Sequence, residues 1–237
     1  MTYYLTIYRK KRGSDKEEWQ TFSYESQTPG DTVASALTYF DHKEELIDVD
    51  GKPARSITWE CSCLQKKCGA CAMVINGRPG LACDVRLSAF PEGKIKVEPL
   101  RKFPVIEDLM VDRTILYRNL ETLHVWLTGD AVLSDRDQET AYRASECLQC
   151  GCCLEICPNF YPDGKFFGMA AVPLTARLLT ELSKEEYRDL AKAYGKHVFA
   201  GCGKSLACRE ICPKRIDTEE LLVNANALAV WKRKKRK

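Results

Sequence analysis

The sequence predicts an α+β protein of two domains, with a strand-rich first half and an all-α second half. Apolar and polar residues alternate near the start of the chain, whereas from about Ile106 the apolar residues recur with a helical period. A chain of 237 residues is long enough for two separate cores. We expect the boundary near Phe103-Pro104, which gives domains over residues 1–105 and 106–237.

Strands and one helix are expected in the first half. Residues 2–9 alternate in polarity, and residues 19–24 are their expected hairpin partner. Pro29-Gly30-Asp31 marks a turn and the start of a helix. That helix carries apolar residues at helical spacing: Val33, Ala36, Leu37 and Phe40. Asn76-Gly77 predicts a hairpin, and residues 94–98 a closing strand, after which no strand signal of comparable strength follows.

Three helices are expected in the second half. An apolar stripe at helical spacing predicts a helix of about four turns. The residues of this stripe are Leu116, Leu120, Leu123 and Leu127. Ser183 and Glu186 form a predicted capping box for a second helix, which stops at Gly195. Asp217 with Glu220 opens a final helix. The apolar residues of that helix are Leu221, Ala225 and Leu228.

Composition and charge narrow the functional classes. Apolar residues make up 45% and charged residues 29% of the chain, as in ordinary globular proteins. No apolar run reaches the ~18 residues that span a bilayer, and the N-terminus lacks a signal-peptide pattern, so we expect a cytoplasmic protein. The net charge is +3, but residues 232–237 are all basic. We interpret this tail as solvated, and nothing else indicates a nucleic-acid partner.

Cysteine is the unusual residue, because thirteen cysteines stand against three histidines. A reducing cytoplasm disfavours disulfides, and an odd number of cysteines cannot pair completely. Zinc or iron–sulfur ligation remains, and the spacing distinguishes them. We expect His42, His124 and His197 to be surface residues or to pack in the core, since none is grouped with a nucleophile or a carboxylate.

The first cysteine group has the plant-type spacing of a [2Fe–2S] site, Cys63-x4-Cys68-x2-Cys71, and Cys83 follows downstream. A four-residue loop can wrap two bridged irons, whereas structural zinc usually uses two close cysteine pairs. Gly69 lets the backbone approach the sulfurs. Cys61 is extra, and we interpret it as a buried small side chain rather than a fifth ligand.

The second group is the bacterial ferredoxin run without deviation, Cys147-x2-Cys150-x2-Cys153-x3-Cys157-Pro158. In such a run three cysteines hold one cluster, and the cysteine before proline reaches a second cluster. Cys152 is out of phase with the ligands, so we do not expect it to bind iron.

The third group repeats this run with Ser205 in place of one cysteine: Cys202-x2-Ser205-x2-Cys208-x3-Cys212-Pro213. Exchange of the pre-proline cysteines predicts two ligand sets, namely Cys147, Cys150, Cys153 and Cys212, and Cys157, Cys202 and Cys208. Four thiolates suit [4Fe–4S], whereas three predict [3Fe–4S] with a raised reduction potential. Binding of a fourth iron by the serine oxygen is the alternative. Two such sites side by side transfer single electrons.

With these motifs the chain resembles the iron–sulfur subunits of succinate dehydrogenases and fumarate reductases over nearly its whole length. Other matching segments are Cys71-Ala72-Met73-Val74-Ile75-Asn76-Gly77, Leu81-Ala82-Cys83, Phe103-Pro104-Val105-Ile106, Asp108-Leu109, Val111-Asp112 and Cys212-Pro213-Lys214. The resemblance implies a plant-type ferredoxin-like β-grasp domain, then a bacterial-ferredoxin-like helical domain, and all three clusters on the cysteines named above.

The resemblance also implies partners. In this family the subunit docks on a flavoprotein with covalently bound FAD, where succinate and fumarate interconvert. It also meets a membrane anchor that binds quinone, often with haem b. Electrons pass between FAD, [2Fe–2S], [4Fe–4S], [3Fe–4S] and quinone. A peripheral position at the cytoplasmic face of the cell membrane is therefore expected.

Two departures from the family pattern concern these partners. Leu64 and Lys66 stand where members commonly have arginine and glycine, in a segment that faces the flavoprotein. Asn159-Phe160-Tyr161 and Gly203 replace a tryptophan pair and a histidine of ubiquinone-reducing members. The second departure favours menaquinone or another low-potential donor.

Three other interpretations stay open. The same relay could serve a flavoprotein that acts on another acid, which Leu64 and Lys66 motivate. A free-standing ferredoxin-like carrier is disfavoured by the size of the helical domain. A zinc-stabilised interaction protein would give a colourless solution instead of a brown one.

Overall fold

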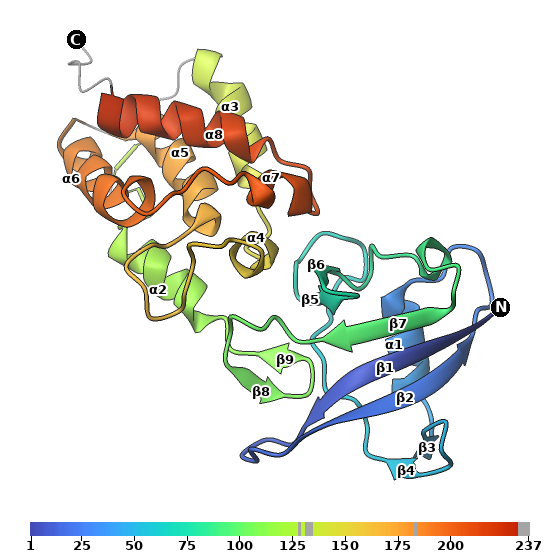
Figure 1. The fold of residues 1–237 in the computed structure, drawn as a ribbon. Coiled ribbons are helices and arrows are strands. Elements are labelled where there is room, and N and C mark those ends of the chain that lie inside the picture. The colour runs from blue at the N-terminus through green and yellow to red at the C-terminus, as the bar shows by residue number, and fades with distance from the viewer. Residues whose placement is uncertain (128, 131–134, 183, 232–237) are drawn as a thin grey trace. The chain divides into compact units, whose positions relative to one another are not determined.

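The computed structural model describes residues 1–127, 129–130, 135–182 and 184–231. The chain divides into two compact units, Met1–Asp112 and Arg113–Lys237. The first unit carries the strands and the second is helical, which confirms the α+β class predicted from the sequence (Figure 1). Within the described part of the chain, no helix combines the length and the apolar character needed to cross a membrane.

A five-stranded sheet forms the first unit, in the order β2-β1-β7-β5-β6. Its strands are β1 (Thr2–Lys10), β2 (Glu17–Glu25), β5 (Ala72–Ile75), β6 (Arg78–Leu81) and β7 (Lys94–Glu98). β1 and β2 pair antiparallel, as predicted, whereas β1 and β7 pair parallel. The alternation buries one face, on which Leu5 and Ile7 have no exposed surface.

Helix α1 (Val33–Asp41) packs on one face of this sheet (Figure 1). A capping box begins it, in which the Thr32 hydroxyl accepts from the Ser35 N–H and the Ser35 hydroxyl accepts from the Thr32 N–H. The predicted apolar stripe is buried, and Leu37 has no exposed surface. A short 3-10 helix, Leu87–Ala89, precedes β7.

The β5–β6 hairpin has the two-residue turn that Asn76-Gly77 predicts. Their φ angles are 46° and 77°, and a type I′ turn needs both to be positive. The Asn76 side chain also accepts a hydrogen bond from the Lys96 N–H at 2.6 Å, which ties the turn to β7. Because Cys71 precedes this hairpin and Cys83 follows it, the turn brings those two cysteines together.

Two short strand pairs were not predicted. They are β3 (Leu46–Ile47) with β4 (Pro53–Ala54), and β8 (Val105–Glu107) with β9 (Met110–Val111). The β8–β9 pair belongs to the first unit, which therefore continues to Asp112, beyond residue 105. The N–H of Asp108 donates to the Lys10 carbonyl, and that of Leu109 to the Thr58 carbonyl. Strands of two or three residues are too short for alternation to be visible in the sequence.

Helices of the second unit surround a separate core. They are α2 (Thr114–Thr122), α3 (Asp135–Ser145), α4 (Cys152–Glu155), α5 (Val172–Glu181), α6 (Lys184–Tyr194), α7 (Ala207–Ile211) and α8 (Thr218–Asn226). A 3-10 turn, Met169–Ala171, leads into α5. α5 packs against α3 and α8 and is buried along most of its length. The capping box expected at Ser183 and the tail at 232–237 lie outside the described residues.

Helix α2 is shorter than predicted. The N–H groups of His124 and Val125 turn back to the carbonyls of Glu121 and Leu120, which are the two bonds of a Schellman motif. His124 takes the left-handed position of that motif, with φ of 52°. Leu127, expected on the helix, lies past this turn and is 38% exposed. A glycine usually marks such a helix end in the sequence. Here a histidine takes that position, so the sequence did not predict where α2 ends.

The later helix ends agree better with the sequence. Asp217 caps α8 by accepting the Glu220 N–H at 3.0 Å, and Leu221 and Ala225 are buried. α6 ends at Tyr194, but Gly195 does not reverse the chain, because a π-helical segment, Gly195–Phe199, continues it. A second π-helical segment, Ala227–Trp231, follows α8.

Candidate metal centres

The first cysteine group lies on a loop before β5 and on the segment after β6. The Ala82 N–H donates to the Cys71 carbonyl at 3.0 Å, and the Cys83 N–H donates to the Cys71 thiol. The thiols of Cys63 and Cys68 are hydrogen-bonded to each other. Burial, followed by the neighbouring thiol of Cys83, raises the pKa of Cys71 to about 12. The structure therefore brings the four predicted residues into one site.

Backbone N–H groups of this loop point at the sulfurs. Those of Gln65 and Lys67 each lie 3.3 Å from Cys63 Sγ, and that of Ala70 lies 3.5 Å from Cys68 Sγ. The first two bonds lower the pKa of the Cys63 thiol to about 7. Left-handed residues make this geometry, namely Leu64, Lys66 and Gly69, with φ of 49°, 57° and 77°. The loop thus favours thiolates and suits an iron-bound sulfur.

Lys66 is one of the two residues of this loop that the sequence resemblance marked as departures. A left-handed conformation favours glycine at this position, and Lys66 adopts it with φ of 57°. Its Nζ forms an ion pair with Asp84 Oδ2 at 2.7 Å. Asp84 follows Cys83 directly, so the pair connects the ligand loop to the segment that carries the fourth cysteine.

Cys61 corrects one expectation. From the sequence we expect a buried small side chain at this position, but Cys61 is exposed. It lies on the irregular segment before Cys63 instead of in a strand or helix. Small apolar residues in irregular segments need not be buried. Such a segment has no helical or strand periodicity, so the sequence could not predict whether the Cys61 side chain faces the core or the solvent.

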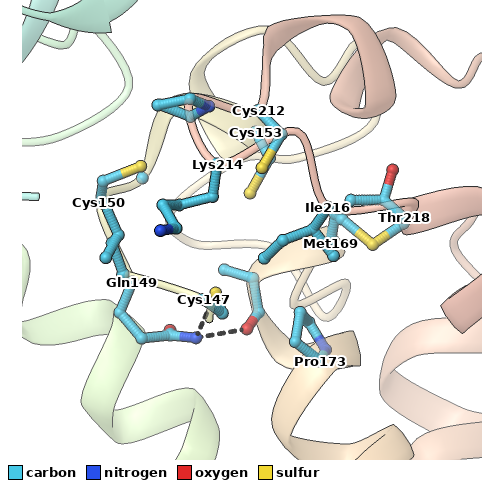
Figure 2. A pocket seen from close by; sticks show the side chains of 14 residues that line it. Cys147, Gln149, Cys150, Cys153, Met169, Pro173, Cys212, Lys214, Ile216 and Thr218 are labelled. Carbon is cyan, nitrogen blue, oxygen red and sulfur yellow. Dashed lines mark hydrogen bonds between the residues drawn. The ribbon is translucent and has the colours of Figure 1, made fainter. Parts of the chain in front are cut away.

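A cavity in the second unit is lined by the thiols of Cys147, Cys150, Cys153 and Cys212 (Figure 2). Cys147 and Cys150 come from the segment that leads into α4, Cys153 lies in α4 itself, and Cys212 directly follows α7. Met169, Pro173 and Ile216 add apolar walls. The pre-proline cysteine of the third group thus lies with the first three cysteines of the second group, which is the arrangement that the exchange rule predicts.

The thiols around this cavity are hard to ionise in the protein alone. Burial raises the pKa of Cys147 to about 11, and burial together with the neighbouring thiols raises that of Cys153 well above its ordinary value. A positively charged iron core bound among them would favour the thiolate forms. Four converging soft ligands in a mostly apolar pocket therefore fit an iron–sulfur cluster.

Cys152 lies outside the residues that line this cavity, although it has no exposed surface. Its thiol is hydrogen-bonded to Cys150, and this bond lowers the pKa of Cys150 to about 7 despite burial. Gly151, with φ of 90°, begins helix α4 just before it. Cys152 thus lies beside a predicted ligand without bordering the cavity, and that it does not bind iron stays a prediction.

A second cavity is lined by Cys157, Cys202 and Cys208 together with Ser205. Its walls also include Phe166, Val172 and Leu222. Lys204 and Leu206 have φ of 56° and 57°, so a strained loop carries Ser205 at the cavity. The Thr218 hydroxyl donates to Cys208 Sγ at 3.9 Å. Three thiols and a hydroxyl thus border this cavity.

Two of the histidines take part in ring contacts. His197 stacks on Phe167, with ring centroids 4.3 Å apart, and its Nδ1 lies 2.9 Å from the Lys165 carbonyl. His124 meets the edge of Trp126. Among the described residues, no three His, Cys, Asp or Glu side chains converge on a single-ion position. Gln149 also lines the four-thiol cavity, and no motif signal in the sequence marks it as a site residue. Lys214 lines the cavity as well, and the sequence offered it only as part of the matching segment Cys212-Pro213-Lys214.

Two family models match the chain. One is described as a 2Fe-2S iron-sulfur cluster binding domain and covers residues 4–118, which include the first cysteine group. The other is described as a 4Fe-4S dicluster domain and covers residues 143–216, which include the second and third groups.

Curated relatives agree with these models. The chain is 32% identical over 200 residues to the succinate dehydrogenase iron-sulfur subunit of Bacillus subtilis (strain 168), across 79% of this chain and 77% of that protein. It is 31% identical over 208 residues to the fumarate reductase iron-sulfur subunit of Escherichia coli O6:H1, across 79% and 83%.

A solved structure, the Mycobacterium smegmatis Sdh1 complex in the apo form, contains a chain with the same fold. The TM-score is 0.75 at 22% identity, over 100% of this chain and 99% of that one. This likeness concerns the fold, and the sequence matches carry the assignment. The chain therefore belongs to the family of iron–sulfur subunits of succinate dehydrogenase and fumarate reductase.

Proposed function

We propose that this protein relays single electrons between a partner FAD flavoprotein and a membrane quinone, as the iron–sulfur subunit of a fumarate reductase or succinate dehydrogenase complex. The observation that carries the proposal is the exchange of the two pre-proline cysteines. Cys212 borders the cavity of Cys147, Cys150 and Cys153, and Cys157 borders that of Cys202 and Cys208. Paired clusters held by two ferredoxin runs require this exchange.

Three clusters are part of the proposal. A [2Fe–2S] cluster is held by Cys63, Cys68, Cys71 and Cys83, within a domain of residues 1–105 that the β8–β9 hairpin extends. In residues 106–237, Cys147, Cys150, Cys153 and Cys212 hold [4Fe–4S], and Cys157, Cys202 and Cys208 hold [3Fe–4S]. Such clusters take up and release single electrons. The chain supplies thiolates, donates N–H groups to sulfur and excludes water, while the substrate site lies on the flavoprotein.

Menaquinone, or another low-potential quinone, is the proposed partner at the membrane. A Cβ added at Gly203 would lie 2.8 Å from Asn159 Nδ2, which is closer than real contacts allow. Asn159 Nδ2 also donates to the Gly201 carbonyl at 2.9 Å. Asn159 therefore fills space that a larger residue at position 203 would need. The two departures from ubiquinone-reducing members, at Asn159 and at Gly203, therefore depend on each other sterically. This coupling supports a quinone site that differs from that of ubiquinone-reducing members.

The proposed location is the cytoplasmic face of the cell membrane. There a quinone-binding anchor subunit of the cytochrome b type would hold this subunit at the membrane surface. Anchors of this family often carry haem b. Membership in a family of complex subunits supports this location.

The deciding experiment is anaerobic purification of the native complex, with counts of iron, sulfide and flavin and identification of the co-purifying subunits. We expect an FAD flavoprotein, and an EPR signal of the oxidised three-iron type after exposure to air. Fumarate reduction driven by menadiol should then exceed succinate oxidation by ubiquinone. Menadiol-driven activity far below the ubiquinone activity would refute the quinone proposal.

The same purification separates the alternative functions. A flavoprotein that is inactive with fumarate and succinate would indicate another acid as the substrate, for which Leu64 and Lys66 are the motivating residues. A monomeric protein that carries clusters but never co-purifies with FAD would indicate a free carrier. Colourless material that contains zinc would end the iron–sulfur interpretation.

A further inference from the structure

The side chain of Gln149 contacts a ligand sulfur of the four-thiol cavity. Its Nε2 donates one hydrogen bond to Cys147 Sγ at 3.2 Å and another to the Ala170 carbonyl at 2.9 Å (Figure 2). Both hydrogens of the amide are therefore used. The Ala170 carbonyl is an acceptor only, and so is the sulfur of Cys147 when it binds iron as a thiolate, so the reversed amide would set its oxygen against two acceptors. The contacts thus determine the orientation of the amide.

This orientation leaves the other end of the amide unsatisfied. Gln149 Oε1 is buried and has no hydrogen-bond partner in the described part of the chain. A buried acceptor without a donor costs stability, and a methionine of similar shape would avoid that cost. The unsatisfied Oε1 of Gln149 therefore costs folding free energy, at a position where the amide nitrogen donates to a ligand sulfur.

The backbone of Gln149 points the same way. Its N–H also donates to the Cys147 thiol, so a single residue directs two N–H groups at one sulfur. Gln149 has φ of 50°, a left-handed conformation that is uncommon outside glycine. Gln149 thus combines a strained backbone, an unsatisfied acceptor and two donors on a ligand sulfur. Backbone strain of this kind is concentrated at functional sites.

We propose that Gln149 is a positioning residue of the [4Fe–4S] cluster, and that its hydrogen bond to Cys147 raises the reduction potential of that cluster. The inference rests on the proposed function. Reduction adds one electron, and no covalent bond forms or breaks. The added negative charge is shared by the ligand sulfurs, and a donor that faces one of them stabilises the reduced form more than the oxidised form.

The test compares the native complex with its Gln149→Met variant. EPR-monitored redox titration should show a one-electron reduction of the four-iron cluster that is about tenfold less favourable, which corresponds to a potential lower by about 59 mV. Gln138→Met on helix α3 is the matched control, because Gln138 is exposed. That control, and the potentials of the two other clusters, should stay unchanged.

A second measurement does not depend on the variant. Wild-type complex labelled with ¹⁵N only in glutamine side-chain amides should show a weak ¹⁵N coupling to the reduced four-iron cluster in pulsed EPR. If Gln149→Met assembles without its cluster, this coupling still decides the question, and its absence from the wild type overturns the proposal.

The outcomes also separate this inference from the proposed function. A wild-type protein without a four-iron cluster would overturn both. A wild-type cluster that keeps its potential in Gln149→Met, or that shifts equally in Gln138→Met, would overturn the role of Gln149 alone.

Discussion

Nε of Arg9 lies 3.3 Å from Oδ1 of Asp108, and neither side chain has any exposed surface. Asp108 also accepts hydrogen bonds from the N–H groups of Lys10 and Thr58, each at 2.9 Å, and from the guanidinium of Arg55. It therefore ties the β8–β9 hairpin to the end of β1 and to the segment that precedes the first cysteine loop. This contact explains an aspartate in the family motif that no cluster chemistry requires.

Asp108→Asn should lower the free energy of unfolding of the first unit by about 3–5 kcal/mol, because it leaves the buried charge of Arg9 without its partner. Urea unfolding of the purified protein, followed by circular dichroism, measures the loss. Asp50→Asn is the matched control: Asp50 is exposed and pairs with Lys52 at 3.5 Å. Its expected change is below about 1 kcal/mol. Equal losses in the two variants would contradict a structural role for the buried pair.

Asp31 offers a prediction about pH. Burial by itself raises the pKa of Asp31, but hydrogen bonds from Thr28, Tyr24 and the Gln27 backbone outweigh burial and lower it from 3.8 to about 2. A depressed pKa stabilises the folded protein above the unfolded value and loses that effect as the pH falls through the folded value. The contribution of Asp31 should therefore be constant from neutral pH down to about pH 4 and vanish near pH 2.

Asp31→Asn tests this sign. The substitution should lower the free energy of unfolding by about 1–3 kcal/mol, because several donors at the start of α1 lose their charged acceptor. The deficit should be equal at pH 6 and pH 8 when thermal unfolding is followed by circular dichroism. A deficit that grew between those two values would show that the carboxyl titrates there, against the depressed pKa.

Ser205→Cys should convert the three-thiol cavity into a four-thiol cavity. Ser205 already borders this cavity beside Cys157, Cys202 and Cys208. We expect loss of the oxidised three-iron EPR signal and a lower reduction potential, because a fourth charged thiolate favours the oxidised cluster.

Ser205→Ala is the control for that experiment. The proposed [3Fe–4S] cluster uses no serine ligand, so the three-iron signal should persist in this variant. Its disappearance would favour the alternative in which the serine oxygen binds a fourth iron.

Lys66→Gly and Lys66→Ala separate backbone strain from the ion pair with Asp84. Both substitutions remove that pair, but only glycine adopts the φ of 57° without a steric cost. The alanine variant should be less stable than the glycine variant by about 1 kcal/mol, and it should lose its [2Fe–2S] cluster faster in the presence of an iron chelator. Visible absorbance measures the loss. Equal rates would show that the backbone of position 66 carries no strain.

Local patterns determined much of this protein. Asn76-Gly77 made its hairpin and Asp217 capped its helix, because turns and caps depend on a few adjacent residues. The cysteine spacings likewise indicated iron–sulfur chemistry, and counting thiols predicted the two sets that line separate cavities. Each of these signals lies within a short stretch of chain or follows from the geometry of a known ligand run.

Only the tertiary structure decided the rest. The Asp108 contacts depend on residues that approach from distant parts of the chain. The end of α2 at a left-handed His124 lacks the glycine that usually marks such an end, and the exposed Cys61 lies on an irregular segment without a period. The contacts of Gln149 likewise come from the folded unit. Its amide donates to both Cys147 and the distant Ala170 carbonyl, and these two bonds together fix the orientation of the amide. Burial and hydrogen-bond partnership are properties of the folded unit, and a residue carries no mark of them in the sequence.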